Sequence, residues 1–172
     1  MNKVNGKKTS FAPVREDGSR ITICYGLKKL SGDRYEWMEV YLPKKQLSQL
    51  TFADVKAAII ADIDERIKAQ IIGGMTWNGK PVWYSIENQL NFTNATAPVT
   101  LKIGEQEDGT AIYEDFETAE QLDTFCTACN AHKQNALTAG WAEKDGIDWA
   151  PYEDYFKTLF HVTSAHTVAA GS

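Results

Sequence analysis

TFADVKAAIIADIDERIKAQIIGGMTWNGKPVWY, residues Thr51 to Tyr84, is the stretch that decides the fold. The Thr51 side chain can accept a hydrogen bond from the backbone N–H of Asp54, whose carboxylate suits the positive end of a helix dipole. Apolar side chains then recur every fourth residue, which predicts one long amphipathic helix with a single buried face. The residues of this stripe are Val55, Ile59, Ile63, Ile67 and Ile71.

The same stretch also contains a stop signal and a turn signal. Gly73-Gly74 predicts the end of the helix, because glycine takes the positive φ of a C-terminal cap without a Cβ clash. Asn78-Gly79 stands between two short runs rich in apolar residues, and both central residues of a type I′ turn need positive φ. We therefore expect a tight hairpin directly after the helix.

The remaining elements are predicted from local signals along the chain. Residues 20–30 and 34–42 have the β-branched and aromatic composition of two paired strands. Ser85 can cap a short helix, and residues 99–103 and 110–116 form a second hairpin around a Glu-Asp-Gly turn. Thr118 and Gln121 make a capping box for a long helix that ends near Trp141, a residue of its expected apolar stripe. The fold class is α+β, with an N-terminal β-hairpin module, a central amphipathic helix, two further β-hairpins and a long second helix.

Four segments follow from this order of elements. Residues 1–19 are polar and without period, which predicts an arm. Residues 20–50 form the β module, and residues 51–150 form the α+β domain. Residues 151–172 are expected to hold a short amphipathic turn with aromatic residues and then a C-terminal tail.

Composition and charge argue against a disordered chain, a membrane protein and a nucleic-acid-binding protein. The 172 residues are 43% hydrophobic and 11% aromatic, enough for a packed core. No long apolar run and no signal peptide are visible, so we expect no membrane contact and synthesis in the cytosol. Residues 1–50 hold ten Lys and Arg against five Asp and Glu, whereas residues 51–172 hold eight against eighteen. Because the basic excess looks scattered, a nucleic-acid partner is disfavoured.

Candidate catalytic and metal sites are weak. Cys126, Cys129 and His132 have a spacing that could face one zinc ion on a helix, but a structural zinc site needs a fourth ligand. Two small thiols on the buried side of a helix explain the same residues. No phosphate-binding glycine loop, H-E-x-x-H or G-x-S-x-G motif is present. We therefore predict a protein without enzymatic activity, cofactor or metal.

Aromatic residues provide the candidate contacts with other molecules. Five tryptophans suit a core, a subunit interface or a sugar-binding platform. Trp37 and Trp149 are the candidate platforms for a host glycan. The residues that we expect to bind a partner protein are Trp37, Tyr152, Tyr155, Phe156 and Phe160.

The stretch from Ile67 to Asp148 resembles a small domain of unknown function that recurs in bacteriophage and prophage proteins, often tail-associated ones. The resemblance is carried by IIGGMTWNGKPVWYSIENQLNF, EDGTAIYEDF, FETAEQLDTF and ALTAGWAEKDGIDW. It implies no catalytic residues. It does imply a structural component of a tailed-phage virion that joins other virion proteins at the tail, collar or a fibre.

The resemblance and the known symmetry of phage appendages together predict a homo-oligomer. Two non-enzymatic alternatives remain open. A tail-fibre assembly chaperone would have the same fold, and a host-surface glycan-binding module would expose its tryptophans. An enzyme would need a pocket with convergent polar groups, which no motif in the sequence indicates.

Overall fold

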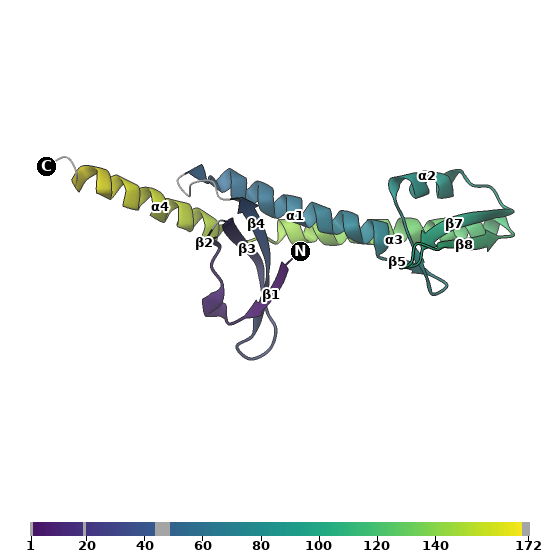
Figure 1. Ribbon diagram of the computed structural model, residues 1–172, viewed down its shortest axis with the longest axis horizontal. Coiled ribbons are helices and arrows are strands. Elements are labelled where there is room, and N and C mark those ends of the chain that lie inside the picture. The colour runs from purple at the N-terminus through teal and green to yellow at the C-terminus, as the bar shows by residue number, and fades with distance from the viewer. Residues whose placement is uncertain (1, 19, 44–48, 170–172) are drawn as a thin grey trace. The chain divides into compact units, whose positions relative to one another are not determined.

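The computed structural model describes residues 2–18, 20–43 and 49–169, and their side chains except those of residues 2, 43 and 160–169. The chain divides into two compact units (Figure 1). Unit 1 comprises residues 1–63 and 143–172, and unit 2 comprises residues 64–142. Two long helices, α1 (Phe52–Gly73) and α3 (Ala119–Asp145), contribute residues to both units. The predicted α+β class is therefore correct.

Unit 1 contains an antiparallel sheet of four strands in the order β1-β4-β3-β2. The strands are β1 (Asn2–Gly6), β2 (Val14–Asp17), β3 (Arg20–Lys29) and β4 (Tyr35–Pro43). The predicted hairpin of residues 20–42 forms the two central strands. The short helix η1 (Lys8–Ser10) connects β1 to the segment before β2.

The prediction of a polar arm over residues 1–19 is wrong for the described part of that segment. Val4 lies opposite Trp37 in the β1–β4 pair, and Val14 lies opposite Ile23 in the β2–β3 pair. Both segments are therefore edge strands. Edge strands of natural sheets are often short and charged, so their sequences lack the apolar alternation by which central strands are recognised.

The core of unit 1 lies between one face of the sheet and two helices. Ile21, Ile23 and Tyr25 of β3 are fully buried, as are Val55, Ile59 and Ile63 of α1. The Tyr25 hydroxyl donates a hydrogen bond to the Asp62 carboxylate on α1. The Tyr152 hydroxyl on α4 (Ala150–Ala169) donates to the backbone carbonyl of Cys24, at 2.6 Å.

Helix α4 corrects the prediction of a short turn and a tail after Pro151. The backbone is helical from Ala150 to Ala169, and residues 170–172 lie outside the described residues. The Asp148 carboxylate accepts a hydrogen bond from the backbone N–H of Ala150, at 3.1 Å. Pro151 is tolerated because it stands in the first turn, where a backbone N–H has no helical partner.

Unit 2 is built from two hairpins, one whole short helix and parts of α1 and α3. The first hairpin pairs β5 (Met75–Trp77) with β6 (Lys80–Val82), and the second pairs β7 (Val99–Glu105) with β8 (Ala111–Phe116). Helix α2 (Ile86–Asn94) follows the first hairpin. The predicted turn at Asn78-Gly79 is confirmed, with φ of 49° and 76°.

Phe125 of α3 is the centre of the unit 2 core. Its ring lies 5.0–5.2 Å, between centroids, from the rings of Trp77, Phe92 and Phe116, which come from β5, α2 and β8. One side chain therefore joins both hairpins and α2 to the first turns of α3. The other buried members of this core are Met75, Val82, Tyr84, Ile103, Leu122 and Cys129.

Helices α1 and α3 begin as predicted, but one position of α3 differs. The backbone N–H of Gln121 donates to the Thr118 hydroxyl, and the Gln121 side-chain oxygen accepts from the backbone N–H of Thr118. Trp141, expected in the apolar stripe, is instead exposed, while Gly140 is buried. A Cβ at Gly140 would lie 1.9 Å from Cδ1 of Ile67 on α1, so the two helices approach too closely here for a side chain.

Candidate functional site

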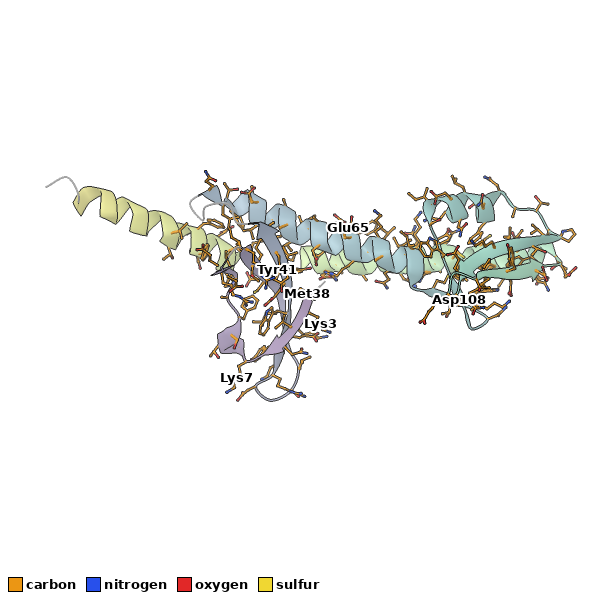
Figure 2. All side chains as sticks on the ribbon, in the orientation of Figure 1. Lys3, Lys7, Met38, Tyr41, Glu65 and Asp108 are labelled. Carbon is orange, nitrogen blue, oxygen red and sulfur yellow. The ribbon has the colours of Figure 1, made fainter. Side chains whose placement is uncertain are left out.

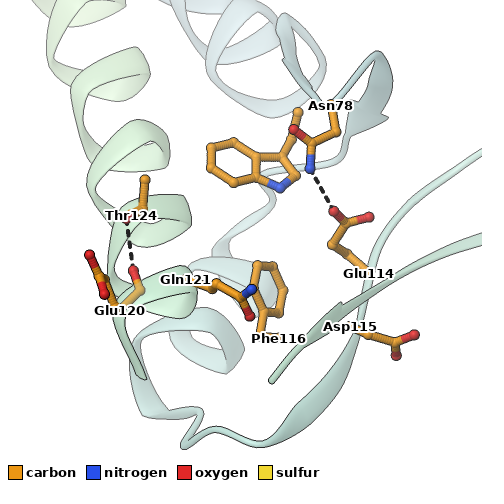
Figure 3. Close-up of a pocket in the computed structure, with 8 residues that line it drawn as sticks. Asn78, Glu114, Asp115, Phe116, Glu120, Gln121 and Thr124 are labelled. Atoms are coloured by element: carbon orange, nitrogen blue, oxygen red, sulfur yellow. Dashed lines mark hydrogen bonds between the residues drawn. The ribbon is translucent and has the colours of Figure 1, made fainter. Parts of the chain in front are cut away.

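A pocket of about 300 Å³ opens in unit 2 beside the β5–β6 turn, the end of β8 and the start of α3 (Figure 3). Aromatic rings from two strands, carboxylates and neutral polar groups line it. The lining residues are Trp77, Asn78, Glu114, Asp115, Phe116, Glu120, Gln121 and Thr124. The pocket is therefore acidic and partly aromatic.

Glu114 is the carboxylate held most firmly in this pocket. It forms an ion pair with Lys80 and accepts a hydrogen bond of 2.8 Å from the Asn78 side-chain amide, drawn in Figure 3. The bond from Lys80 holds the pKa of Glu114 below its ordinary value, against the opposing effect of burial. Glu114 is thus ionised at neutral pH and already has two partners.

Trp77 forms part of the pocket wall and packs edge-on against Phe125. Its Nε1–H is buried and has no acceptor with hydrogen-bond geometry. The indole nevertheless lies near enough to Glu114 to help lower the pKa of that carboxyl. Because no acceptor lies in hydrogen-bond geometry with its N–H, Trp77 acts on Glu114 as a neighbouring dipole and not as a bonded donor.

The polar groups on the α3 side of the pocket maintain the start of the helix. The Gln121 side-chain oxygen accepts bonds from the backbone N–H groups of Glu117 and Thr118. The Thr124 hydroxyl donates to the backbone carbonyl of Glu120, at 2.7 Å (Figure 3). Asp115, on β8, accepts from the Thr100 hydroxyl.

The lining combines carboxylates, aromatic rings and neutral polar groups. The sole hydroxyl, that of Thr124, donates to the backbone. Carboxylates beside aromatic rings suit a cationic or hydrogen-bond-donating group of a ligand.

The three candidate metal ligands do not converge. The Cys126 thiol donates to the backbone carbonyl of Phe92, whereas His132 Nε2 lies 2.9 Å from the backbone carbonyl of Gln70. Cys129 lies in the core, where burial raises its pKa to about 12. Across the described ranges, no group of three or more His, Cys, Asp or Glu side chains has an arrangement that could hold a metal ion.

The residues predicted to bind a partner all belong to unit 1. Trp37 is only 3% exposed, and Tyr152 and Phe156 are also buried. Tyr155 is half-buried and packs edge-on against Phe156, and the side chain of Phe160 lies outside the described residues. The expectation that Trp37 could be an exposed platform is therefore wrong, while the partner-binding role of the α4 residues stays a prediction.

The buried Trp37 belongs to a polar network around Glu39, which is itself only 6% exposed. The Glu39 carboxylate accepts hydrogen bonds from Trp37 Nε1 at 3.1 Å, the Tyr41 hydroxyl at 3.0 Å and the Arg15 guanidinium at 2.9 Å. Burial alone would raise the pKa of Glu39, but these donors and the Arg15 charge outweigh it and lower the pKa. Nearby Cys24 is buried too, and its pKa is raised to about 11, so its thiol is not a nucleophile at neutral pH.

Trp149, the second candidate platform, is half-buried. Its ring packs edge-on against Phe52, and the Lys56 ammonium lies 5.2 Å from its centroid. The indole is thus engaged by α1 on at least one side.

Unit 2 exposes a group of apolar side chains that the sequence did not single out. Trp83, Ile86 and Leu90 are 52%, 71% and 61% exposed. Ile86 and Leu90 are four residues apart on α2, so they share one face of the helix, and Trp83 stands just before it. We call these three residues the apolar row. In the structure the Phe92 side chain of α2 lies in the core, whereas those of Ile86 and Leu90 do not.

A match to a known family covers the pocket and the apolar row. Residues 54–159 match the domain of unknown function DUF4376. The chain belongs to the DUF4376 family. The DUF4376 domain includes nearly all of α1, both hairpins of unit 2, α2, α3 and the first half of α4, whereas the sheet β1–β4 lies outside it.

The match is longer than the resemblance seen in the sequence, which began at Ile67 and ended at Asp148. No curated protein and no solved structure matches the chain. No helix in the described part of the DUF4376 protein has the length and apolar character needed to cross a membrane.

Proposed function

We propose that this DUF4376 protein is a non-enzymatic structural component of a tailed-phage particle, which joins other particle proteins at the tail, collar or a fibre. The connection with phages comes from the sequence resemblance. The observation that supports a joining role is the apolar row, in which three large apolar side chains more than half exposed fall within eight residues. Single exposed apolar residues are ordinary, but a contiguous group typically marks a contact with another protein.

The mechanism is contact alone. On docking, the still exposed parts of Ile86 and Leu90 would lose water, and Trp83 would supply the kind of aromatic anchor that dominates interface energies. Burying what remains exposed of Ile86 and Leu90 contributes about 1–2 kcal/mol each. Together they supply about 2–4 kcal/mol, which corresponds to roughly 30- to 900-fold in affinity.

The experiment is quantitative mass spectrometry of purified particles from the phage or prophage that encodes the chain. We expect the protein in mature particles at a fixed ratio to the tail proteins. An assembly chaperone would be abundant in infected cells but absent from the particles, and that result would contradict the proposal.

The contact surface is tested by variants of the full-length protein. We expect Ile86→Ser combined with Leu90→Ser to prevent incorporation into particles while the far-UV circular dichroism spectrum stays unchanged. Trp141→Ser is the control, because Trp141 is a 54% exposed apolar residue of unit 2 outside the apolar row. Normal incorporation of the double variant would contradict the role of the apolar row.

A further inference from the structure

Five of the ten positive charges of residues 1–50, which look scattered in the sequence, lie at one end of the unit 1 sheet. Gly6 lies opposite Tyr35 at the end of β1, and Lys29 lies opposite the same Tyr35 at the end of β3. The residues that follow β1 are therefore beside the β3–β4 turn. This end of the sheet carries Lys7, Lys8, Lys28, Lys29 and Arg34, which we call the basic end.

All five side chains of the basic end are exposed. Figure 2 shows Lys7 at the end of unit 1 where the β3–β4 turn lies. The two nearby acids compensate little, because Glu36 is already paired with Lys3 at 2.8 Å and only Asp33 remains. No described carboxylate forms an ion pair with the four lysines of the basic end. Antiparallel pairing thus produces the concentrated basic surface that the sequence did not indicate.

The residue types of the basic end favour a phosphate backbone over an acidic protein surface. Four of its five cations are lysines, a residue depleted at protein–protein interfaces. Lysine ammonium groups suit phosphates, which they bind as point charges. Trp37 is buried and offers no surface on which a base could stack.

We propose that the basic end binds the phosphate backbone of duplex DNA without reading its sequence. This binding is additional to the proposed joining role, since it uses the sheet that lies outside the DUF4376 domain. The expectation that nucleic acid is not a partner depended on scattered charge, and that premise does not hold for the folded chain.

The proposal has a quantitative signature in its dependence on salt. Each neutralised phosphate contributes about −0.9 to the slope of log K against log salt, so five contacts give about −4.5. Affinity should then fall roughly 500-fold between 50 and 200 mM salt. With two lysines removed, the slope becomes about −2.7 and the same change of salt costs roughly 40-fold.

The experiment is fluorescence anisotropy of a labelled 20-base-pair duplex of mixed sequence, titrated with the full-length protein at several salt concentrations. The test variant is Lys28→Gln combined with Lys29→Gln. The matched control is Lys68→Gln with Lys157→Gln, which removes two equally positive, exposed lysines from other elements. We expect the slope of the test variant to be shallower by about 1.8 and the control to keep the wild-type slope.

Three results would overturn the proposal. One is the absence of duplex binding at 50 mM salt. Another is a slope that the test variant and the wild type share, since the contacts would then lie elsewhere. The third is binding to vesicles containing phosphatidylserine that the test variant loses, in the absence of duplex binding. That result would assign the basic end to anionic lipid, a surface that Leu30, 44% exposed beside the basic end, would also suit.

Discussion

Helices α1 and α3 approach each other closely at Gly140 in unit 2. We therefore predict that Gly140→Ala changes the free energy of unfolding in opposite directions in the wild-type protein and in an Ile67→Ala variant. Adding a methyl group at Gly140 places its Cβ 1.9 Å from Cδ1, 2.4 Å from Cγ1 and 3.7 Å from Cβ of Ile67. Favourable carbon–carbon contacts lie near 3.5–4.0 Å, so the first two approaches force the Ile67 side chain or the helices to move. The third distance is an ordinary contact.

The expected change in the free energy of unfolding has two opposing contributions. Overpacking of this kind costs about 1–3 kcal/mol, and alanine regains about 1 kcal/mol over glycine within a helix. Gly140→Ala should therefore destabilise the wild-type protein by about 1 kcal/mol. In an Ile67→Ala background, both clashing atoms are gone and only the helix-propensity gain remains, so Gly140→Ala should stabilise by about 1 kcal/mol.

The assay is a double-mutant cycle measured by urea denaturation, with tryptophan fluorescence and far-UV circular dichroism as independent probes. Ile67→Ala alone should cost about 2–5 kcal/mol, because Ile67 is buried and leaves a cavity. The coupling free energy between the two sites should be about 1–3 kcal/mol. An equal effect of Gly140→Ala in both backgrounds would refute the close helix approach.

Three further predictions concern other parts of the fold. Phe125→Ala should destabilise the protein by about 3–5 kcal/mol in urea denaturation, because the ring joins both hairpins to α3; a loss below 1 kcal/mol would contradict its central position. Gly79→Ala should cost about 1 kcal/mol by the same assay, since Gly79 has a φ of 76°, and an unchanged midpoint would argue against the turn. The pKa of Glu39 is lowered in the folded state, so its stabilisation is present above its ordinary value of 4.5 and is lost as pH falls through the folded value. Glu39→Gln should therefore reduce the loss of thermal stability on acidification, and an identical pH profile would contradict the network.

The parts of the fold that the sequence predicts well are those determined by neighbouring residues. Asn78-Gly79 makes its turn, and the reciprocal bonds of Thr51 with Asp54 and of Thr118 with Gln121 start α1 and α3. Each of these signals acts within four residues. Local chemistry alone therefore specifies where these elements begin.

The parts that the sequence reasoning missed depend on distant partners. Residues 2–6 become a strand only because β4 offers an edge, and their own sequence, NKVNG, has no strand signal. Trp141 is exposed because the neighbouring buried position, Gly140, lies against Ile67. The apolar row and the basic end likewise appear only when the strands and α2 are in place, so periodicity along the chain could not indicate them.

The central claim is that the apolar row holds the protein in a phage particle, and a competition between two forms of the chain tests it most directly. Wild-type protein and the Ile86→Ser/Leu90→Ser variant are produced together in cells that assemble the particles. The two forms differ in mass in any peptide that spans both positions, so mass spectrometry gives their ratio in cell lysate and in purified particles. We predict that the particles contain less than about a tenth of the variant fraction found in the lysate, because its affinity falls at least roughly 30-fold. Equal ratios in lysate and particles would contradict the claim.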